Sequence, residues 1–355
     1  MSGLRAADLA GAACPIPIQD YPHVLLAHGG GGRLTHMLIE KMFAATFANP
    51  ALAPLHDGAR LDVDGARLAV TTDSFVVSPR FFPGGDIGSL AVHGTVNDLA
   101  MCGARPIALT AAFVLEEGLA MEELWRIVLS MRAAAADVPV PIVTGDTKVV
   151  ERGKGDGLYI NTTGIGVVRA GLEILPGAAR PSDVVILNGP IAQHGIAIMS
   201  VREGLEFGTK VESDSAALGG LVSALLDAVG PAVRVLRDPT RGGVSSALNE
   251  IAQASRAGIR LEEAKIPIRE DVRGACEILG FDPLYVANEG KVLAIVAARE
   301  AERALAAMRA HPLGREAAIV GEVVEDHPGR VYLRSRVGGL RVVDMLSGEQ
   351  LPRIC

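Results

Sequence analysis

The sequence is poor in cysteine, in basic charge and in long uncharged runs. Its four cysteines form no CxxC pair and lie in no histidine pattern, so neither a disulfide framework nor a zinc site is indicated. The 34 Lys and Arg against 41 Asp and Glu give a net charge of −7, which disfavours nucleic acid as the main partner. The longest uncharged stretch, 184–201, contains Asn, Gln, His and a Gly-Pro pair. It therefore predicts a strand, a turn and a helix, not a membrane span.

The first residues lack the basic start and apolar core of a signal peptide. Together with the dispersed thiols, this predicts a cytoplasmic protein that acts on a small molecule or another protein.

Apolar runs with strand character alternate with helical patterns through both halves of the chain. The strand patterns cover 68–77, 107–114, 141–144, 158–168, 184–187, 232–236 and 291–296. The helical patterns cover 33–46, 89–102, 121–136, 215–229, 244–254 and 299–309. This interleaving predicts an α/β or α+β protein, and the length of 355 residues favours two domains. A glycine and proline cluster at 169–182 marks a plausible boundary.

Five segments suit phosphate or metal chemistry, and the first is the glycine run Gly29, Gly30, Gly31 and Gly32 before a predicted helix at Arg33. Glycine lets backbone N–H groups approach an anion closely, and a helix N-terminus attracts negative charge. The run matches neither the Walker pattern nor GxGxxG. By itself it is equally typical of a flexible loop without a nucleotide role.

The second and third segments place acids beside buried elements. Asp73 ends an apolar strand, where active-site residues of α/β folds emerge and where an acid also caps turns. Asp86 leads into an apolar helix that contains the adjacent pair Asn97 and Asp98. Burying that pair is costly without a partner, and a magnesium ion with phosphate oxygens is a suitable one. We interpret His93, in the same helix, as a packing or hydrogen-bonded histidine.

The fourth and fifth segments again follow apolar strands. In the fourth we expect a turn that presents Asp146 and Lys148, with the lysine placed to neutralise phosphate charge. In the fifth, Asp238 offers a hard oxygen ligand, and the turn with Thr240 and Gly242 would admit phosphate. A turn with an ordinary helix cap is the alternative explanation of the fifth segment.

Acids from three of these segments point to one shared site. Asp73, Asp98 and Asp238 are distributed over both halves of the chain. Polyphosphate needs more counter-charge than one carboxylate-bound ion provides. The three acids therefore predict a nucleotide–magnesium site where the halves meet.

The sequence ends in a short tail, Leu-Pro-Arg-Ile-Cys at 351–355. A thiol on a tail whose Pro352 ends regular structure can move between sites, as a swinging carrier must. An incidental cysteine at a frayed end is the alternative. An ATP-site pattern without a nucleophile of its own favours Cys355 as a carrier.

These segments resemble the PurM-like ATP-binding superfamily and, within it, the hydrogenase maturation family HypE. The matching stretches are 28–33, 71–75, 85–106, 143–148, 238–243 and the Pro-Arg-Ile-Cys ending at 352–355. The resemblance implies a two-domain α+β fold like that of AIR synthetase. It comprises an N-terminal extension (1–26), an ATP-binding domain (27–168) whose mixed sheet forms a barrel with a second copy, an α/β sandwich-like domain (169–340) and a flexible tail (341–355).

The resemblance also implies an ATP-dependent enzyme that dehydrates a carbamoyl group on Cys355, from S-carboxamide to S-cyanate. The product would supply the cyanide ligands of the nickel–iron hydrogenase centre. A HypF-like carbamoyltransferase would load the cysteine, and a HypC–HypD complex would accept the cyanide. The protein would act as a homodimer, without nucleic acid or membrane.

Residue roles follow from the same resemblance. Asp73, Asp98 and Asp238 would hold Mg²⁺ between the triphosphate oxygens of ATP, and the glycine run would cover the nucleotide. Lys148 would stabilise charge on the transferred phosphoryl group. Glu289 would remove the amide protons, although a surface turn explains this residue nearly as well.

Two alternative functions stay open. Selenophosphate synthetases are similar through the middle of the chain but carry a reactive cysteine followed closely by lysine, whereas Cys14 here is followed by proline. A small-molecule phosphotransferase or synthetase of that superfamily would not need the tail. A non-catalytic module would dock HypC–HypD and relay cyanide without hydrolysing ATP.

Overall fold

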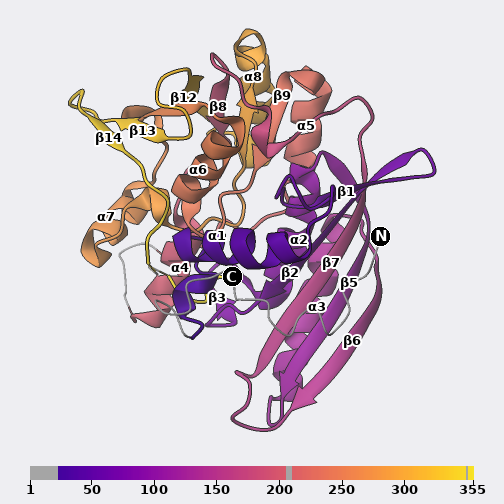
Figure 1. The fold of residues 1–355 in the computed structure, drawn as a ribbon. Coiled ribbons are helices and arrows are strands. Elements are labelled where there is room, and N and C mark those ends of the chain that lie inside the picture. The colour runs from indigo at the N-terminus through magenta and orange to yellow at the C-terminus, as the bar shows by residue number, and fades with distance from the viewer. Residues whose placement is uncertain (1–22, 205–209, 349–350) are drawn as a thin grey trace, which may run out of the picture.

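The computed structural model describes residues 23–204, 210–348 and 351–355, which form two units, each with its own sheet (Figure 1). The strands of the first unit are β1 (Ala59–Val63), β2 (Ala66–Phe75), β3 (Phe81–Phe82), β4 (Gly85–Asp86), β5 (Ala104–Glu116), β6 (Ile142–Val150) and β7 (Leu158–Val168). Its helices are α1 (Arg33–Leu38), continued by the π-helical η3 (Ile39–Ala44), α2 (Ile87–Met101) and α3 (Met121–Asp137).

The strands of the second unit are β8 (Val184–Leu187), β9 (Val233–Arg237), β10 (Gly258–Glu262), β11 (Leu293–Val296), β12 (Ala318–Val324), β13 (Val331–Arg334) and β14 (Leu340–Val342). Its helices are α4 (Gln193–Arg202), α5 (Gly219–Val229), α6 (Gly243–Ser255), α7 (Glu270–Leu279) and α8 (Ala301–Ala310).

The first sheet is mixed and has one covered face. Its strand order is β1-β2-β7-β5-β6, and only the β5–β6 pair is parallel. Apolar side chains of α2 and α3 pack on one face, among them Leu90, Val96 and Ile127. The other face exposes polar side chains such as Thr72 and Ser74, and edge strand β6 is exposed along nearly its whole length. The long strands of this sheet project at the lower right of Figure 1.

The second sheet is covered on both faces. Its seven strands run in the order β14-β13-β10-β12-β8-β11-β9. Successive residues of β8 enter different cores, because side chains alternate across a strand. Val185 and Leu187 pack with α6 and α7, whereas Ile186 packs with α5 and α8. The predicted two-unit α+β fold, with a sandwich-like second unit, is therefore confirmed.

Helix α2 and the tail connect the two units. Asn97 on α2 donates hydrogen bonds to the carbonyls of Ala216 (3.0 Å) and Glu289 (3.3 Å) and accepts one from the Leu218 N–H (2.7 Å). Ile354 and Cys355 lie in the same core as α2 and α3. Figure 1 places the C-terminus between the units, near α4 and β2.

Most predicted elements are present, including the strand, turn and helix expected in 184–201. The turn expected at Asp146 and Lys148 was wrong, because both residues lie within β6. Gly145 sits where a Cβ would lie 2.1 Å from the Ala111 carbonyl oxygen, so it permits close strand pairing and does not end the strand. In the part of the chain that the structure describes, no helix is long and apolar enough to span a membrane.

Candidate functional site

Three carboxylates from distant parts of the chain meet between the units. Asp57 precedes β1, Asp98 lies on α2 and Asp238 follows β9, and one carboxylate oxygen of each lies within 4.8 Å of the others. The Thr71 hydroxyl, on β2, lies 2.7 Å from Asp98 Oδ2 and 2.9 Å from the Asp57 carbonyl oxygen. Two of the three predicted ligands are thus brought together, and Asp57 completes the cluster.

Mutual repulsion and burial control the ionisation of this acid cluster. Burial is the main cause that raises the pKa of Asp98 well above its ordinary value, and the charges of Asp238, Asp73 and Asp57 raise it further. Burial and the Asp57 charge raise the pKa of Asp238 to about 8. A bound divalent cation would reverse this preference for protonation, because it stabilises the charged carboxylates.

The two carboxylate oxygens of Asp57 have different surroundings. Its Oδ1 lies 2.8 Å from Arg237 Nη1, and Arg237 also pairs with Glu250. Its Oδ2 is buried and accepts no hydrogen bond from the described residues, although it lies 3.4 Å from His56 Nδ1, which accepts from the Asp57 N–H. A carboxylate oxygen without a hydrogen bond, beside two further carboxylates, fits a hard divalent cation such as Mg²⁺.

Asp57 was missed in the sequence, although a signal was present. The apolar residues Ala59, Leu61 and Val63 alternate with polar ones directly after it, and they form β1. Asp57 thus flanks a strand at its start, whereas Asp73 was identified near the end of one. Asp73 itself lies close enough to raise the pKa of Asp98 and Asp238, and burial raises its own pKa.

The two glycine segments pack against each other. Gly31 and Gly242 both have positive φ, at 73° and 76°. A Cβ on Gly31 would lie 2.7 Å from Arg241, and one on Gly242 would lie 2.7 Å from the Gly31 carbonyl oxygen. Arg241 Nη1 also donates to the Gly29 carbonyl (2.9 Å). The predicted loops therefore form one backbone cradle beside the acid cluster.

A cavity of about 550 Å³ adjoins this cradle. It is lined by residues of both units, including Gly31, Asp57, Arg237, Thr240 and Arg241. Its lining combines one member of the acid cluster, Asp57, with cationic side chains and glycine backbone, which are the kinds of group that bind a metal–polyphosphate complex.

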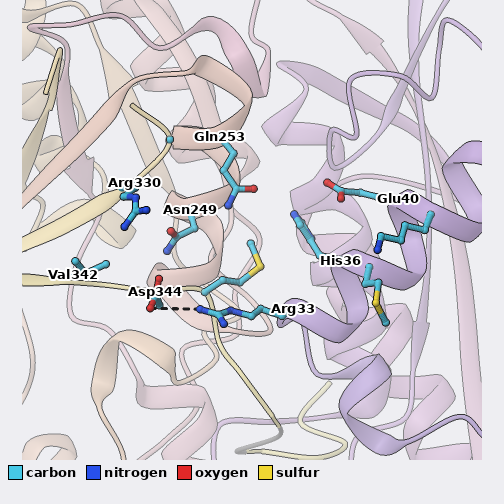
Figure 2. Close-up of a pocket in the computed structure, with 12 residues that line it drawn as sticks. Arg33, His36, Glu40, Asn249, Gln253, Arg330, Val342 and Asp344 are labelled. Atoms are coloured by element: carbon cyan, nitrogen blue, oxygen red, sulfur yellow. Dashed lines mark ion pairs between the residues drawn. The ribbon is translucent and has the colours of Figure 1, made fainter. Parts of the chain in front are cut away.

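A second pocket, of about 450 Å³, separates the helix after the glycine run from α6 (Figure 2). In Figure 2, Arg33, His36 and Glu40 approach from α1 and η3 and face Asn249 across the pocket. Arg33 pairs with Asp344 at 3.4 Å. This pair ties the glycine run to the second unit.

The Cys355 thiol is docked inside the protein. It is 9% exposed, and burial raises its pKa to about 12. The Glu289, Asp73 and Asp238 charges raise the pKa further, whereas the Arg241 guanidinium opposes them. The thiol therefore lies within electrostatic range of the acid cluster and of Arg241, whose role was not predicted.

Glu289 is a buried acid with an unsatisfied oxygen. It is 4% exposed, and its Oε1 has no hydrogen-bond partner within the described part of the chain. Burial, followed by the charges of Asp238, Asp73 and Asp214, raises its pKa well above the ordinary value. A surface turn is therefore the wrong interpretation, and the position fits a proton acceptor near Cys355.

Several predicted residues have other contacts in this chain. Asp86 caps α2, because its Oδ1 accepts from the N–H groups of Gly88 (2.7 Å) and Ser89 (3.1 Å). Lys148 pairs with Asp146 at 2.8 Å on exposed β6, which β5 and β7 separate from β2. The predicted nucleotide contacts of Asp86, Asp146 and Lys148 stay predictions, as does that of the bridging Asn97.

His93 accords with its interpretation as a hydrogen-bonded histidine. Its Nδ1 lies 3.1 Å from the Ser215 hydroxyl, and burial lowers its pKa. It therefore links α2 to the segment that leads into α5.

Substituting Asp98 with asparagine is expected to weaken Mg²⁺ binding, because the amide retains the shape of the site but removes one charge. In thermal unfolding with increasing Mg²⁺, the variant should gain about 1.4 kcal/mol less stabilisation for each tenfold loss of affinity. Asp62→Asn is the matched control, because Asp62 is exposed on β1 and pairs with Arg67. An unchanged Mg²⁺ response in Asp98→Asn would contradict the assignment of the metal site.

Comparisons with known proteins, made for single domains and for the whole chain, give matching results. Residues 55–168 match the family model "AIR synthase related protein, N-terminal domain", and residues 180–334 match the corresponding C-terminal domain. The chain is 58% identical to the carbamoyl dehydratase HypE of Cupriavidus necator over 331 aligned residues. The aligned region covers 93% of this chain and 94% of that protein.

Two solved structures show the same relationship. A chain in the crystal structure of a HypE–HypF complex has 48% identity and a TM-score of 0.83, over 87% of this chain and 99% of that chain. A hydrogenase maturation protein HypE in complex with ATP has 50% identity and a TM-score of 0.79, over 94% of this chain and 100% of that chain. The chain therefore belongs to the HypE family of hydrogenase maturation proteins, as its motifs predicted.

Proposed function

We propose that the protein uses ATP to dehydrate a carbamoyl group carried on Cys355, which supplies cyanide for the metal centre of nickel–iron hydrogenase. The docked tail carries this proposal, because it buries the Cys355 thiol within electrostatic range of Glu289 and of the acid cluster. Relatives named carbamoyl dehydratase, and a related HypE in complex with ATP, support the same chemistry.

The proposed reaction removes one oxygen and two protons from the S-carboxamide. The amide oxygen attacks the γ-phosphoryl group, so that an O–P bond forms and ADP leaves. Loss of one N–H proton gives a phosphorylated imidate. The C–O bond then breaks, the second N–H proton is lost, and the C≡N bond forms while phosphate departs with the oxygen. The C–S bond to Cys355 persists, and the product is the S-cyanate.

Residues of both units divide this work. Asp57, Asp98 and Asp238 would hold Mg²⁺, and Asp73 adds negative charge beside them. When bound, Mg²⁺ supplies charge stabilisation for the transferred phosphoryl group. The cradle formed by the glycine run and the turn at Gly242 would approach the triphosphate through its backbone.

The loading partner in this proposal is a HypF-like carbamoyltransferase, since a related HypE forms a complex with HypF. In the docked position, burial raises the pKa of the Cys355 thiol to about 12, and a neutral thiol is a weak nucleophile. Loading would therefore require the tail to leave its dock. The flexibility predicted for 341–355 stays a prediction, and the first two residues of that range belong to strand β14 (Leu340–Val342). A HypC–HypD complex is the proposed cyanide acceptor.

The exposed edge of the first sheet supports the predicted homodimer. Val143 and Val149 on β6 are 59% and 66% exposed, and an uncovered apolar edge strand is a surface that proteins normally cover. Covering by a second copy would bury this edge and place Lys148 at the interface.

Removing the tail tests the proposed function directly. A chain that ends at Gly348 should bind ATP but show no ADP release above background when a carbamoyl donor and a HypF-like protein are present, because the acceptor thiol is missing. Full-length Cys276→Ser, which changes a buried thiol of the second unit, is the control and should turn over normally.

Two outcomes would contradict the proposal. Turnover that survives truncation would indicate a small-molecule phosphotransferase. Absence of carbamoyl-dependent ADP release from the unchanged protein would indicate a passive relay.

A further inference from the structure

Each of the last four residues accepts a hydrogen bond from the body of the protein at a main-chain oxygen. The Cys355 main-chain oxygen accepts from the Val76 N–H at 2.9 Å, and the Arg353 carbonyl accepts from the Ser78 N–H at 3.2 Å. The pairing runs antiparallel, since the tail descends from 355 to 353 while the partner ascends from 76 to 78. The tail thus pairs with the chain segment directly beyond β2.

Helix α4 supplies the donors on the other side of the tail. His194 Nε2 lies 2.7 Å from the Ile354 carbonyl oxygen, and Arg202 donates to the carbonyls of Pro352 and Arg353. The Arg202 Nε also donates to the Ser78 carbonyl, so one guanidinium binds both the tail and the segment that pairs with it. The tail lies between α4 and the extension of β2.

The contacts of His194 fix its tautomer. A carbonyl oxygen can only accept, so Nε2 carries a proton. Burial lowers the pKa of His194 and so favours the neutral imidazole, in which Nδ1 accepts from the Ser213 hydroxyl at 2.7 Å. Ser213 Oγ in turn accepts from the Ser215 N–H at 3.0 Å. The Phe82 ring meets the imidazole edge-on, with ring centroids 5.5 Å apart. His194 is therefore held as a preoriented donor toward the tail.

The side chains of the tail contribute less selective contacts. Ile354 is 2% exposed and packs in the core beneath α2, where an apolar side chain of similar size would fit. Arg353 pairs with Asp156 and donates to the Val76 carbonyl at 3.0 Å. The docked position of the tail is therefore set chiefly by hydrogen bonds to its main chain, as in the addition of a strand to a sheet edge.

We propose that His194 and Arg202 are positioning residues that form, with residues 76–78, a receptor for the main chain of the tail. This receptor sets where the Cys355 sulfur lies relative to Glu289. The biological role of this receptor rests on the proposed function. The docking itself does not, because the contacts are present in the protein without a carbamoyl group. The receptor gives a role to a helix that contributes nothing to the acid cluster.

Alkylation of Cys355 in the native full-length protein measures this docking. The docked thiol is buried, so a small reagent such as iodoacetamide reacts through the undocked fraction. Arg202→Ala should accelerate alkylation of Cys355 about tenfold, because it removes two charge-assisted hydrogen bonds to the tail. His194→Ala should accelerate it about fivefold, which is the effect of losing one net hydrogen bond. Peptide mass spectrometry would resolve each cysteine.

Three controls separate docking from general stability. His194→Gln retains a side-chain N–H donor at the position of Nε2 and should restore slow alkylation. Arg303→Ala removes an arginine that donates to the Ala228 carbonyl on the far side of the second unit, and it should change nothing. The buried thiols Cys102 and Cys276 report the integrity of the two units in every variant.

Unchanged alkylation of Cys355 in Arg202→Ala, with Cys102 and Cys276 still protected, would overturn the proposal. Equal acceleration in His194→Gln and His194→Ala would remove His194 from the receptor. Exposure of Cys102 or Cys276 in His194→Ala would mean that this variant has lost its fold. The alkylation rate of Cys355 in Arg202→Ala then tests the receptor, because Arg202 is only half-buried and its substitution disturbs the core less. The assay contains neither ATP nor a carbamoyl donor, so failure of the proposed dehydration would leave its result unaffected.

Discussion

Cys355→Ser is expected to abolish covalent modification of the chain while leaving its fold and ATP binding intact. Serine is close to cysteine in size, and the tail is held mainly by carbonyl groups that the substitution does not alter. The hydroxyl, however, is a far weaker nucleophile than a thiol and is not expected to accept the carbamoyl group. The tail of the variant should therefore remain docked but carry no carbamoyl group.

Intact-mass spectrometry checks this prediction after incubation with carbamoyl donor, a HypF-like protein and ATP. The unchanged protein should acquire first the carbamoyl and then the cyano adduct, and Cys355→Ser should acquire neither. Cys102→Ser is the matched control, because Cys102 is a buried thiol that donates to the Gly58 carbonyl (3.4 Å). This variant should still be modified at Cys355. A cyanated Cys355→Ser protein would eliminate the carrier role.

Glu289→Gln is expected to lower the kcat of dehydration by about 10²- to 10⁴-fold, the range contributed by a positioned general base. The substitution should preserve the fold, because Glu289 is buried with a raised pKa and glutamine matches its neutral form in shape. ATP and Mg²⁺ binding should change little. The carbamoylated intermediate should accumulate, since loading precedes the step that needs the base.

The pH dependence gives a second readout for Glu289. A base with a raised pKa is protonated over more of the neutral range, so the kcat of the unchanged protein should rise with pH until that pKa is passed. Glu289→Gln should lack this rise. Asp183→Asn, which alters a buried acid paired with Arg234 away from the tail, should keep it. A normal kcat and pH profile in Glu289→Gln would exclude it as the base.

Local patterns identified the acids because their chemistry conflicts with their surroundings. Asp98 lies within an apolar helix and Asp238 follows an apolar strand. A buried carboxylate needs a hydrogen-bond donor or a cation beside it, and the local sequence supplies neither. Each of the two acids lies beside the other and beside Asp57, so the partner that they lack would be a divalent cation shared by all three. The fold brings these three residues together from separate elements, which no single segment reveals.

Patterns failed where a residue type has two physical uses. Gly145 was interpreted as part of a turn, whereas it allows strand β6 to approach Ala111 closely. His194 and Arg202 lie on a helix that the sequence predicted, yet their role depends on a tail more than 150 positions away. Hydrogen bonds of that range arise from tertiary packing, and main-chain acceptors leave no side-chain signature in the sequence.

Main-chain docking has a consequence for how the cycle ends. The bonds to the main-chain oxygens of the tail do not involve the sulfur, so under the proposed function they would hold a carbamoylated and a cyanated tail with similar strength. Completion of the proposed dehydration would therefore give no signal for release. A protein that collects the cyanide would have to compete for the tail by offering its own backbone donors, or it would have to wait for a spontaneous opening. Handover would then be timed by the collector or by the rate of that opening, and not by dehydration itself.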